Sequence, residues 1–512
     1  MAISVEPFIV DQFKGIREYN GVASGGQISA IEAKNVELIP NDIGSSVGLK
    51  TMKGNINAYT LPEGFKVIEI FKSVQDGITY KFIYAESETV GRLYYVDITN
   101  SLQVIIDNLT VTGNANGLTM TSSAYDVFVF TNGVEAKTVC FTTDAGYGDS
   151  VKTITATDEL NRNVHWLSMV EWNGFLVVAS EYGVHSSHQN NIYKWNDNPD
   201  DIADSWHIDF SKKVTAVYAF TGGLYIFTAT DTSYLNTTPN DTTNSKLELI
   251  AGVGCFSYTS LVKHDTYLYF YDNVQKNVYY IQNIDSGQMR PAGPIAKEIQ
   301  SRFEDVKRFK MYSCIYSNWN QVWCIINDEL YICDYAQGEW LQRDEQKLNS
   351  ICLIGNSVYT GTDGRNVLLE NVGNNFNGDF KAAVYQTTFI NLGTDTNIKK
   401  QKTPLLLVLK RENNQDFWVE LTVNSKAKTP KRINIRVDGA RYIKAGDTEG
   451  ARYNISHYPN KPKGAKTVIE ISTPQTWYSI GIKIYTASLG QEFYIQSLEL
   501  KNIKEKTKTR GR

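Results

Sequence analysis

The sequence has few of the features that mark secreted, disulfide-rich or membrane proteins. Its 512 residues include six cysteines, six methionines and twelve prolines. The cysteines form no C-x-x-C pair, and most lie in apolar runs such as the one around Cys324, so buried free thiols are expected rather than a disulfide framework. No apolar run approaches the ~18 residues of a membrane-spanning helix, and the N-terminus has no signal-peptide pattern. We therefore expect a soluble protein that is made in a reducing cytoplasm and has no membrane segment of its own.

Net charge is also nearly absent, but only in the sum. The whole chain has a formal charge of −4. Residues 381–512 hold 24 Lys and Arg against 11 Asp and Glu, a net of +13, which leaves −17 for residues 1–380. This division predicts two parts that face different surroundings. The near-neutral sum therefore does not exclude a role around DNA.

Aromatic residues are abundant, with 31 tyrosines and 21 phenylalanines. Aromatic and β-branched side chains fit the pleated, half-buried surface of a sheet, so this composition favours strands. Apolar residues recur at helical spacing over residues 295–309, where we expect a helix. Elsewhere the apolar period is two, which predicts an all-β protein.

Short hairpins recur along the middle of the chain. The two clearest are Glu171–Val178, with an Asn-Gly turn, and Phe220–Phe227, with a Gly-Gly turn. These turn residues supply the positive φ angles that a tight hairpin needs. The second turn residues fall at 77, 125, 174, 223, 265, 320 and 356, and another short strand follows each hairpin. A repeat of roughly 40–50 residues with four strands predicts a β-propeller of about seven blades. A β-sandwich with accidental spacing is the alternative.

The pattern predicts three regions. Residues 1–60 are irregular and contain several glycines, which indicates an extended N-terminal arm and first strands. Residues 61–372 form the propeller. Residues 373–512 form a C-terminal antiparallel, sandwich-like β domain with a basic tail. Its strands are expected at Tyr385–Ile390, Leu405–Lys410, Phe417–Val423, Ile433–Val437, Thr467–Ile471, Ile480–Tyr485 and Phe493–Leu498.

Motifs for catalysis, cofactors or metals are weak. His185 and His188 are the closest histidine pair, but their polar stretch reads as a loop and no third ligand stands at a diagnostic spacing. There is no G-x-S-x-G and no phosphate-binding glycine loop. Residues 142–146 and 360–364 come nearest to the turns of sialidase-like propellers, yet both lack the required Trp. Pairs of acid/base carboxylates stay open, because Asp and Glu are abundant and nothing in the sequence selects one pair. No metal site is expected from the histidines.

The C-terminal segment Lys501–Arg512 is strongly basic, with six positive side chains and one negative. Such a tail is suited to contact DNA phosphates or an acidic partner subunit. A solvated terminus without a role is the alternative. The candidate contact residues are Lys501, Lys504, Lys506, Lys508, Arg510 and Arg512.

Several short sequence motifs resemble those of a known protein family. In order, they are residues 13–16, 25–38, 47–55 and 61–68, then the turn at 362–368, the strand around Thr387–Ile390 and the lysine-rich 399–402. This order resembles phage virion proteins of the tail-nozzle and packaged-DNA stabilisation type. Thr51 and Lys53 stand where arginine is commoner in that family, and residues 440–512 match none of its phrases.

The resemblance implies a structural role in the tail of a short-tailed phage. The protein would not be an enzyme and would have no catalytic, cofactor-binding or metal-binding residues. Copies would form a homo-oligomeric ring, expected to be a hexamer, at the distal end of the portal–adaptor–tail channel. The ring would retain packaged double-stranded DNA without sequence specificity and provide its exit path. Its partners would be the adaptor and portal ring proteins and tail fibre or needle proteins. The protein would be synthesised in the bacterial host cytoplasm and located in the virion. The alternatives are a glycan-binding or glycoside-cleaving propeller and an ordinary cytoplasmic propeller scaffold.

Overall fold

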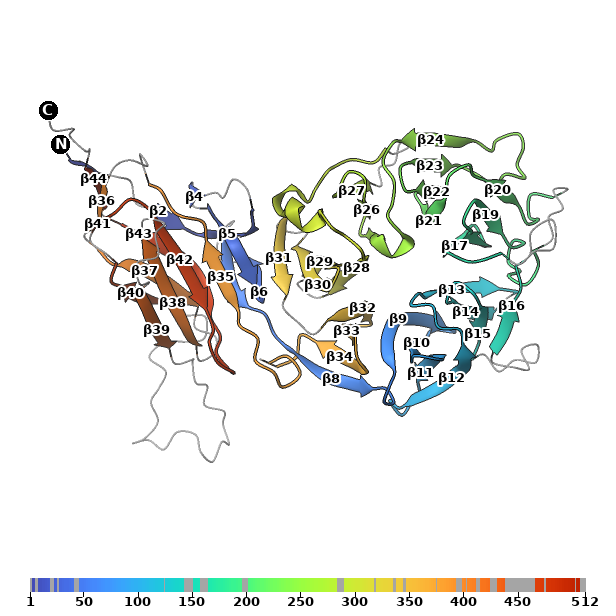
Figure 1. Ribbon diagram of the computed structural model, residues 1–512, viewed down its shortest axis with the longest axis horizontal. Coiled ribbons are helices and arrows are strands. Elements are labelled where there is room, and N and C mark those ends of the chain that lie inside the picture. Colours follow the sequence, from blue (N-terminus) through green and yellow to red (C-terminus); the bar gives the residue numbers. More distant parts are fainter. Residues whose placement is uncertain are drawn as a thin grey trace. The chain divides into compact units, whose positions relative to one another are not determined.

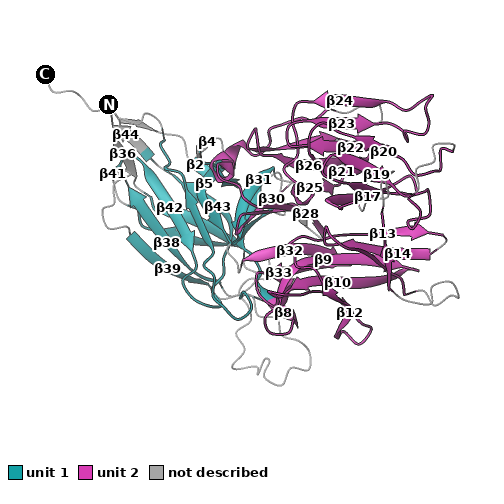
Figure 2. Cartoon of the chain, turned by 45° about the vertical axis from the view of Figure 1, so that its right-hand side comes forward, with its two compact units in different colours: residues 1–55, 337–344, 371–512 teal, residues 56–336, 345–370 magenta. Residues whose placement is uncertain are grey.

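The computed structural model divides the chain into two compact units. Unit 1 comprises Met1–Asn55, Gln337–Asp344 and Asn371–Arg512, and unit 2 comprises Ile56–Ala336 and Glu345–Glu370. Figure 2 colours them teal and magenta. The residues that the structure describes are 2–4, 8–18, 23–24, 27–40, 46–123, 125–141, 151–156, 164–195, 201–282, 290–316, 319–334, 338–343, 347–373, 375–392, 398–401, 403–410, 415–423, 431–437, 466–473, 476–501 and 503–506.

Unit 2 consists of small antiparallel sheets arranged in a ring (Figure 1). Within the described residues, five of them have four strands. The first four of these are β9–β12 (Lys66–Gln75, Ile78–Glu86, Gly91–Val96, Leu102–Leu109), β13–β16 (Asn116–Ser122, Tyr125–Thr131, Ala136–Val139, Val151–Ile154), β17–β20 (Ser168–Trp172, Phe175–Ala179, Gly183–Ser186, His207–Asp209) and β21–β24 (Val214–Phe220, Gly223–Thr228, Thr232–Leu235, Leu247–Ala251). They are followed by β25–β27 (Leu261–His264, Tyr267–Asp272, Asn277–Gln282) and β28–β30 (Phe309–Tyr316, Trp319–Ile326, Glu329–Asp334). The last is β32–β34 (Leu348–Ile354, Ser357–Thr362, Asn366–Glu370), completed by β8 (Asn55–Thr60).

These sheets confirm the predicted propeller, with a small difference in the blades. In the described part of the chain, six of these strand groups form separate small sheets, one fewer than the roughly seven blades expected. The group β28–β30 is assigned to a larger sheet. The β28–β30 meander packs beside β25 and β32 in the remaining place of the ring. The sheets β25–β27 and β28–β30 have three described strands rather than the predicted four.

The blades are held together by apolar faces that pack between them. Between the first two sheets, the rings of Phe82 and Phe128 stack with centroids 4.3 Å apart, and both side chains are fully buried. The third and fourth sheets bury Val177 against Leu224 in the same way. One small sheet cannot bury both of its faces alone, so a ring of blades that cover each other is the stable solution.

The clearest predicted hairpins are present, one with a shifted turn. Asn173 and Gly174 take the expected positive φ angles of 54° and 82° between β17 and β18. In the next repeat the turn residues are Thr221 and Gly222, not the predicted Gly-Gly pair. Gly223 instead begins β22, where an added Cβ would lie 2.2 Å from the Tyr234 ring. That glycine is required by close packing and not by the turn.

The ring closes where β8 joins the last sheet. The ammonium group of Lys81 on β10 donates hydrogen bonds to the hydroxyls of Tyr59 on β8 and Tyr359 on β33, each at 3.0 Å. It also lies 4.7 Å from the centroid of the Tyr359 ring. These contacts tie the first sheet to the strand that completes the last one.

Unit 1 is an antiparallel β assembly with a few parallel pairings. Its strands are β1 (Ala2–Ser4), β2 (Phe8–Val10), β3 (Gln12–Ile16), β4 (Ala23–Ser24), β5 (Gln27–Lys34), β6 (Val36–Pro40), β7 (Val47–Thr51), β31 (Glu339–Arg343), β35 (Val384–Thr387), β36 (Ile398–Gln401), β37 (Leu405–Lys410), β38 (Gln415–Val423), β39 (Lys431–Val437), β40 (Lys466–Ile471), β41 (Thr476–Trp477), β42 (Ile480–Tyr485), β43 (Tyr494–Leu500) and β44 (Ile503–Lys506). Every strand expected in residues 373–512 is present, two of them with the predicted bounds. Alternating side chains of β37, β38 and β42 fill its core.

The prediction of an extended N-terminal arm is wrong. Strand β5 pairs with β35, with Ala33 opposite Tyr385, and β2 pairs with β43. Ile28, Ala30 and Ala33 are fully buried. The N-terminal strands are therefore integral to the C-terminal β unit, because their small and apolar residues supply part of its core. Residues 56–60, also assigned to the arm, belong to the propeller as most of β8.

The helix expected over residues 295–309 is much shorter. A 3-10 helix, η2, covers Lys297–Phe303, and Ile299 within it has a non-helical φ of −123°. Phe309 already begins β28. Ile299 and Phe303 are buried, so the apolar spacing reflects burial rather than a continuous helix. Another 3-10 turn, η1 (Tyr258–Ser260), precedes β25. Over the described ranges, no helix is long and apolar enough to cross a membrane.

Candidate functional site

The first cavity of unit 2 lies where several innermost strands begin. It measures about 200 Å³ and is lined by residues at the starts of β13, β17 and β21 and by η1 with the residues before it. Its apolar walls include Leu167, Val214, Phe256 and Tyr258. Its polar groups include Asn114, Asn116, Lys213 and Ser257.

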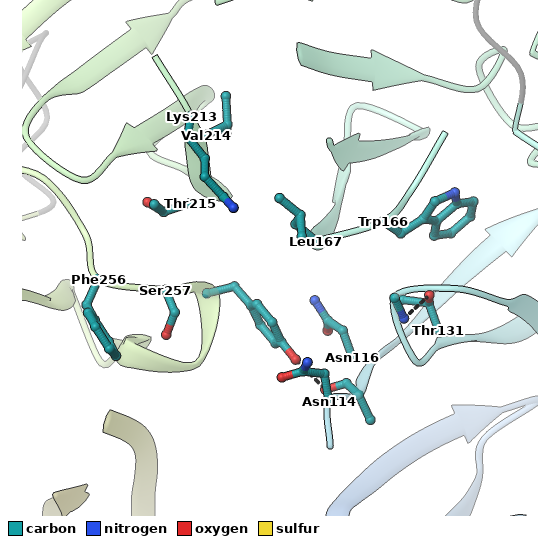
Figure 3. A pocket seen from close by; sticks show the side chains of 13 residues that line it. Asn114, Asn116, Thr131, Trp166, Leu167, Lys213, Val214, Thr215, Phe256 and Ser257 are labelled. Atoms are coloured by element: carbon teal, nitrogen blue, oxygen red, sulfur yellow. Dashed lines mark hydrogen bonds between the residues drawn. The ribbon is translucent and has the colours of Figure 1, made fainter. Parts of the chain in front are cut away.

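Figure 3 shows how these side chains are directed. The amine of Lys213 and the amide of Asn116 point into the open space, whereas the Trp166 ring points away from it. Trp166 packs instead against Trp195 in the core, with ring centroids 5.7 Å apart. The cavity therefore presents hydrogen-bond donors over an aliphatic and aromatic surface, without a flat Trp platform.

A second cavity of about 300 Å³ lies between β9, β13, β28 and β32. Ala115, Asn116 and Tyr258 line both cavities. The Tyr258 hydroxyl donates a hydrogen bond to the Ala115 carbonyl oxygen at 2.9 Å, which joins η1 to the residue before β13. Burial raises the pKa of Tyr258, so this hydroxyl stays protonated and keeps donating.

A buried ion pair lies beside the second cavity. The ammonium group of Lys310 is 2.8 Å from Glu69 Oε2, and the Tyr312 hydroxyl donates to Glu69 Oε1 at 3.0 Å. Burial raises the pKa of Glu69, and the charge of Lys310 opposes that shift. Burial next to Glu69 raises the pKa of Tyr312 well above its ordinary value. A phenol with a raised pKa is a poor nucleophile, so the group serves as a link between β9 and β28.

His264 forms a Ser–His–Asn chain that resembles a catalytic arrangement. Its Nδ1 is 2.9 Å from Ser313 Oγ, and its Nε2 is 2.7 Å from Asn320 Oδ1. The imidazole is fully buried, and burial lowers its pKa. A substrate has no access to a buried ring of this kind, so the chain links β25 to β28 and β29.

The two histidines of the H-x-x-H stretch have different partners. His188 Nδ1 lies 3.1 Å from Asp204 Oδ1, whereas His185 Nε2 contacts Ser180 Oγ at 3.2 Å. His185 belongs to strand β19, so the stretch is not wholly a loop as expected. Among the residues that the structure describes, no group of three or more His, Cys, Asp or Glu side chains is placed to hold a metal ion.

The basic tail is only partly described. Lys501 follows β43, and its ammonium group pairs with Glu499. Lys504 and Lys506 belong to β44, which lies between β1 and β36 in a small sheet. Residues 503–506 are thus a strand and not a free end. Lys508, Arg510 and Arg512 lie outside the described residues, and nothing here brings the six predicted contacts into one site.

Sequence reasoning missed the cavity residues because they carry no motif. Asn116, Lys213 and Tyr258 come from separate blades and are far apart in the chain. Their shared signal is position, since each stands at or just before the first strand of its repeat. An alignment of the repeats on their innermost strands would have placed them together.

Comparison with known proteins assigns the chain to no family. No protein-family model and no curated protein matches the sequence. Similar solved structures include BamB from Moraxella catarrhalis, with 9% identity and a TM-score of 0.38 over 66% of this chain and 94% of that one. The computationally designed Ika8 protein has 8% identity and a TM-score of 0.37, over 62% of this chain and 100% of that one. The extracellular domain of the hybrid two component system BT4673 from B. thetaiotaomicron has 11% identity and a TM-score of 0.39, over 77% of this chain and 48% of that one.

Proposed function

We propose that the protein is a structural virion protein of a short-tailed phage. Copies form a ring, the nozzle, at the distal end of the portal–adaptor–tail channel, where it retains packaged double-stranded DNA and provides its exit path. The observation that carries the proposal, beside the sequence resemblance, is the division of charge. Counted over the two compact units, unit 1 has a net charge of +10 and unit 2 a net charge of −14.

The division of charge between the two units is suited to a protein that lines a DNA channel. Basic side chains bind DNA phosphates or an acidic neighbouring ring through contacts that release counterions. An acidic surface repels the same phosphates, so DNA passes it without sticking. A chain that carries a basic unit and an acidic unit can dock on a partner through one unit, while the other presents DNA with a surface that binds its phosphates weakly.

The proposed assembly is a closed homo-oligomer, expected to be a hexamer. A ring of this kind uses heterologous contacts, in which one surface of a subunit binds a different surface of the next. Units of opposite net charge favour such a head-to-tail arrangement. The adaptor and portal rings on one side, and tail fibre or needle proteins on the other, are the proposed neighbours.

The test is genome retention in particles that lack this protein. Phage particles assembled without it should package DNA and then lose it, so that the DNA becomes sensitive to added DNase. Supplying the intact chain to these particles should restore protection. Particles that keep a protected genome without the protein would contradict the proposal, and a simultaneous loss of attachment to host polysaccharide would favour the glycan-binding alternative.

A further inference from the structure

We propose that the first cavity of unit 2 binds a small organic carboxylate with a ring-sized apolar body. The site is separate from the proposed channel function and does not depend on it. It is built from the starts of β13, β17 and β21 and from η1, and it offers one cationic group and one amide above apolar walls.

The size and walls of the cavity define the body of the ligand. A buried apolar cavity of about 150 Å³ is enough to hold benzene. At about 200 Å³, the first cavity accepts one such ring with a small polar group attached. Leu167, Val214 and Phe256 supply the apolar contacts, so a fully polar ion such as phosphate would leave much of this surface uncovered.

The donors that point into the cavity define the polar end of the ligand. Lys213 and Asn116 point into the space (Figure 3). The ion pair of Lys213 with Glu181 at 3.2 Å is weak, because both side chains are more than half exposed, at 58% and 57%. Within the described residues, no hydrogen-bond partner engages the Asn116 side chain. An ammonium group has donors but no acceptor, so a ligand group that only accepts suits it best.

Other polar groups around the cavity are already bonded within the protein. The Tyr258 hydroxyl donates to the Ala115 carbonyl oxygen, and Ser257 Oγ bonds to Thr259 Oγ1 at 2.8 Å. Thr215 Oγ1 donates to the Cys255 carbonyl oxygen at 2.7 Å. These bonds fix the walls in place, which leaves Lys213 and Asn116 as the groups that select the ligand.

The charge of the cavity lining is opposite in sign to the net charge of unit 2. Unit 2 has a net charge of −14, yet none of the described residues that line the first cavity is Asp or Glu, and Lys213 is one of them. An acidic protein surface would ordinarily exclude anions. The lining thus carries a cation and no carboxylate of its own, and the exposed Glu181 that pairs with Lys213 lies outside it, so an anion can replace Glu181 as the partner of Lys213.

The test is calorimetric titration of the intact chain with benzoate, supported by thermal unfolding. Benzoate should bind and raise the melting temperature, whereas benzamide, its neutral isostere, should bind at least about tenfold more weakly because it lacks the charge. The variant Lys213→Gln should weaken benzoate binding by about tenfold to a hundredfold. Lys212→Gln is the matched control, since the neighbouring Lys212 pairs with Asp231 and does not line the cavity.

Three results would overturn the proposal. These are the absence of benzoate binding at millimolar concentration, equal binding of benzamide and benzoate, and equal effects of Lys213→Gln and Lys212→Gln. Both lysines are more than half exposed, so neither variant should impair folding. A second variant, Asn116→Ala, should also weaken benzoate binding while leaving the melting temperature of the free protein nearly unchanged.

Discussion

At the scale of single residues, the buried polar groups of the propeller act as links between blades. Glu69 with Lys310, and His264 with Ser313 and Asn320, each join strands of different sheets. Groups of these types could have been catalytic in principle. Their burial and saturated hydrogen bonds assign them to the architecture, and the same features make their loss measurable.

The first prediction concerns pH and His264. Because burial lowers its pKa below 6.5, His264 remains neutral in the folded protein at a pH where the unfolded chain is already protonated. Its contribution to stability is complete above pH 6.5 and is lost as the pH falls through the lowered folded-state pKa. The variant His264→Gln should therefore lose less melting temperature between pH 7.5 and 5 than the natural protein. His165→Gln, at an exposed position, is the control, and identical pH profiles for all three proteins would refute this role.

The second prediction concerns the Glu69–Lys310 pair. The variant Lys310→Met leaves the Glu69 carboxylate buried without its cation, so the free energy of unfolding should fall by about 3–5 kcal/mol at pH 7. The double variant Glu69→Gln with Lys310→Met should recover part of that loss, because no charge then remains buried. Urea denaturation of the three proteins measures both effects. A double variant less stable than Lys310→Met would show that the pair is not coupled in this way.

At the scale of elements, the outcome of the sequence prediction depends on the surroundings of each strand. Strands Leu405–Lys410 and Ile480–Tyr485 were predicted with the observed bounds because the first is an almost unbroken apolar run and the second has Ile at every second position. Strand β5 was missed because Ser29 and Ala30, although buried, interrupt its apolar residues, so the sequence shows neither pattern there. The Gly-Gly turn was misplaced by one residue, since Gly223 is fixed by the Tyr234 ring rather than by backbone conformation.

The cavity could not be predicted at all from local pattern. Asn116 and Tyr258, which line both cavities, are brought together by closure of the ring and not by nearness in sequence. Period and turn chemistry determine that blades form. The shape of the space between the starts of their innermost strands depends on the side chains of several blades at once, so it emerges only in the folded unit.

The third prediction concerns closure of the ring by β8. The variant Lys81→Met removes two hydrogen bonds and a cation–π contact from the Tyr59 and Tyr359 pair. We expect faster hydrogen exchange in β8 and in its neighbour β34, with a loss of about 1–3 kcal/mol in unfolding free energy. Lys137→Met on β15, whose ammonium group contacts Thr153, is the control. Unchanged exchange in β8 would mean that Lys81 does not secure the closure.

At the scale of the whole molecule, the two units carry net charges of opposite sign. A sum of −4 conceals units of +10 and −14. The N-terminal strands, which the sequence prediction placed outside the C-terminal domain, belong to the basic unit and add little to its charge. The division read from the sequence therefore persists when the charges are counted over the compact units.

The fourth prediction concerns the basic tail. Deleting residues 507–512 removes Lys508, Arg510 and Arg512 and leaves β44 intact, so the melting temperature should stay nearly constant. If these residues contact DNA, affinity for a short duplex should fall, and the slope of log affinity against log salt should shrink by about 2–3. Deleting Lys501–Arg512 should also lower the melting temperature, because β1 and β36 then lose their partner β44. An unchanged salt slope after the shorter deletion would exclude the tail from DNA contact.

The central claim is that copies of this chain form a ring that extends a phage portal channel. The most direct measurement is electron microscopy of the purified intact protein mixed with portal–adaptor complexes. The account predicts rings of this protein, with six copies each, that cap the adaptor end and continue its axial channel. A protein that stays monomeric and leaves the adaptor end bare would contradict it.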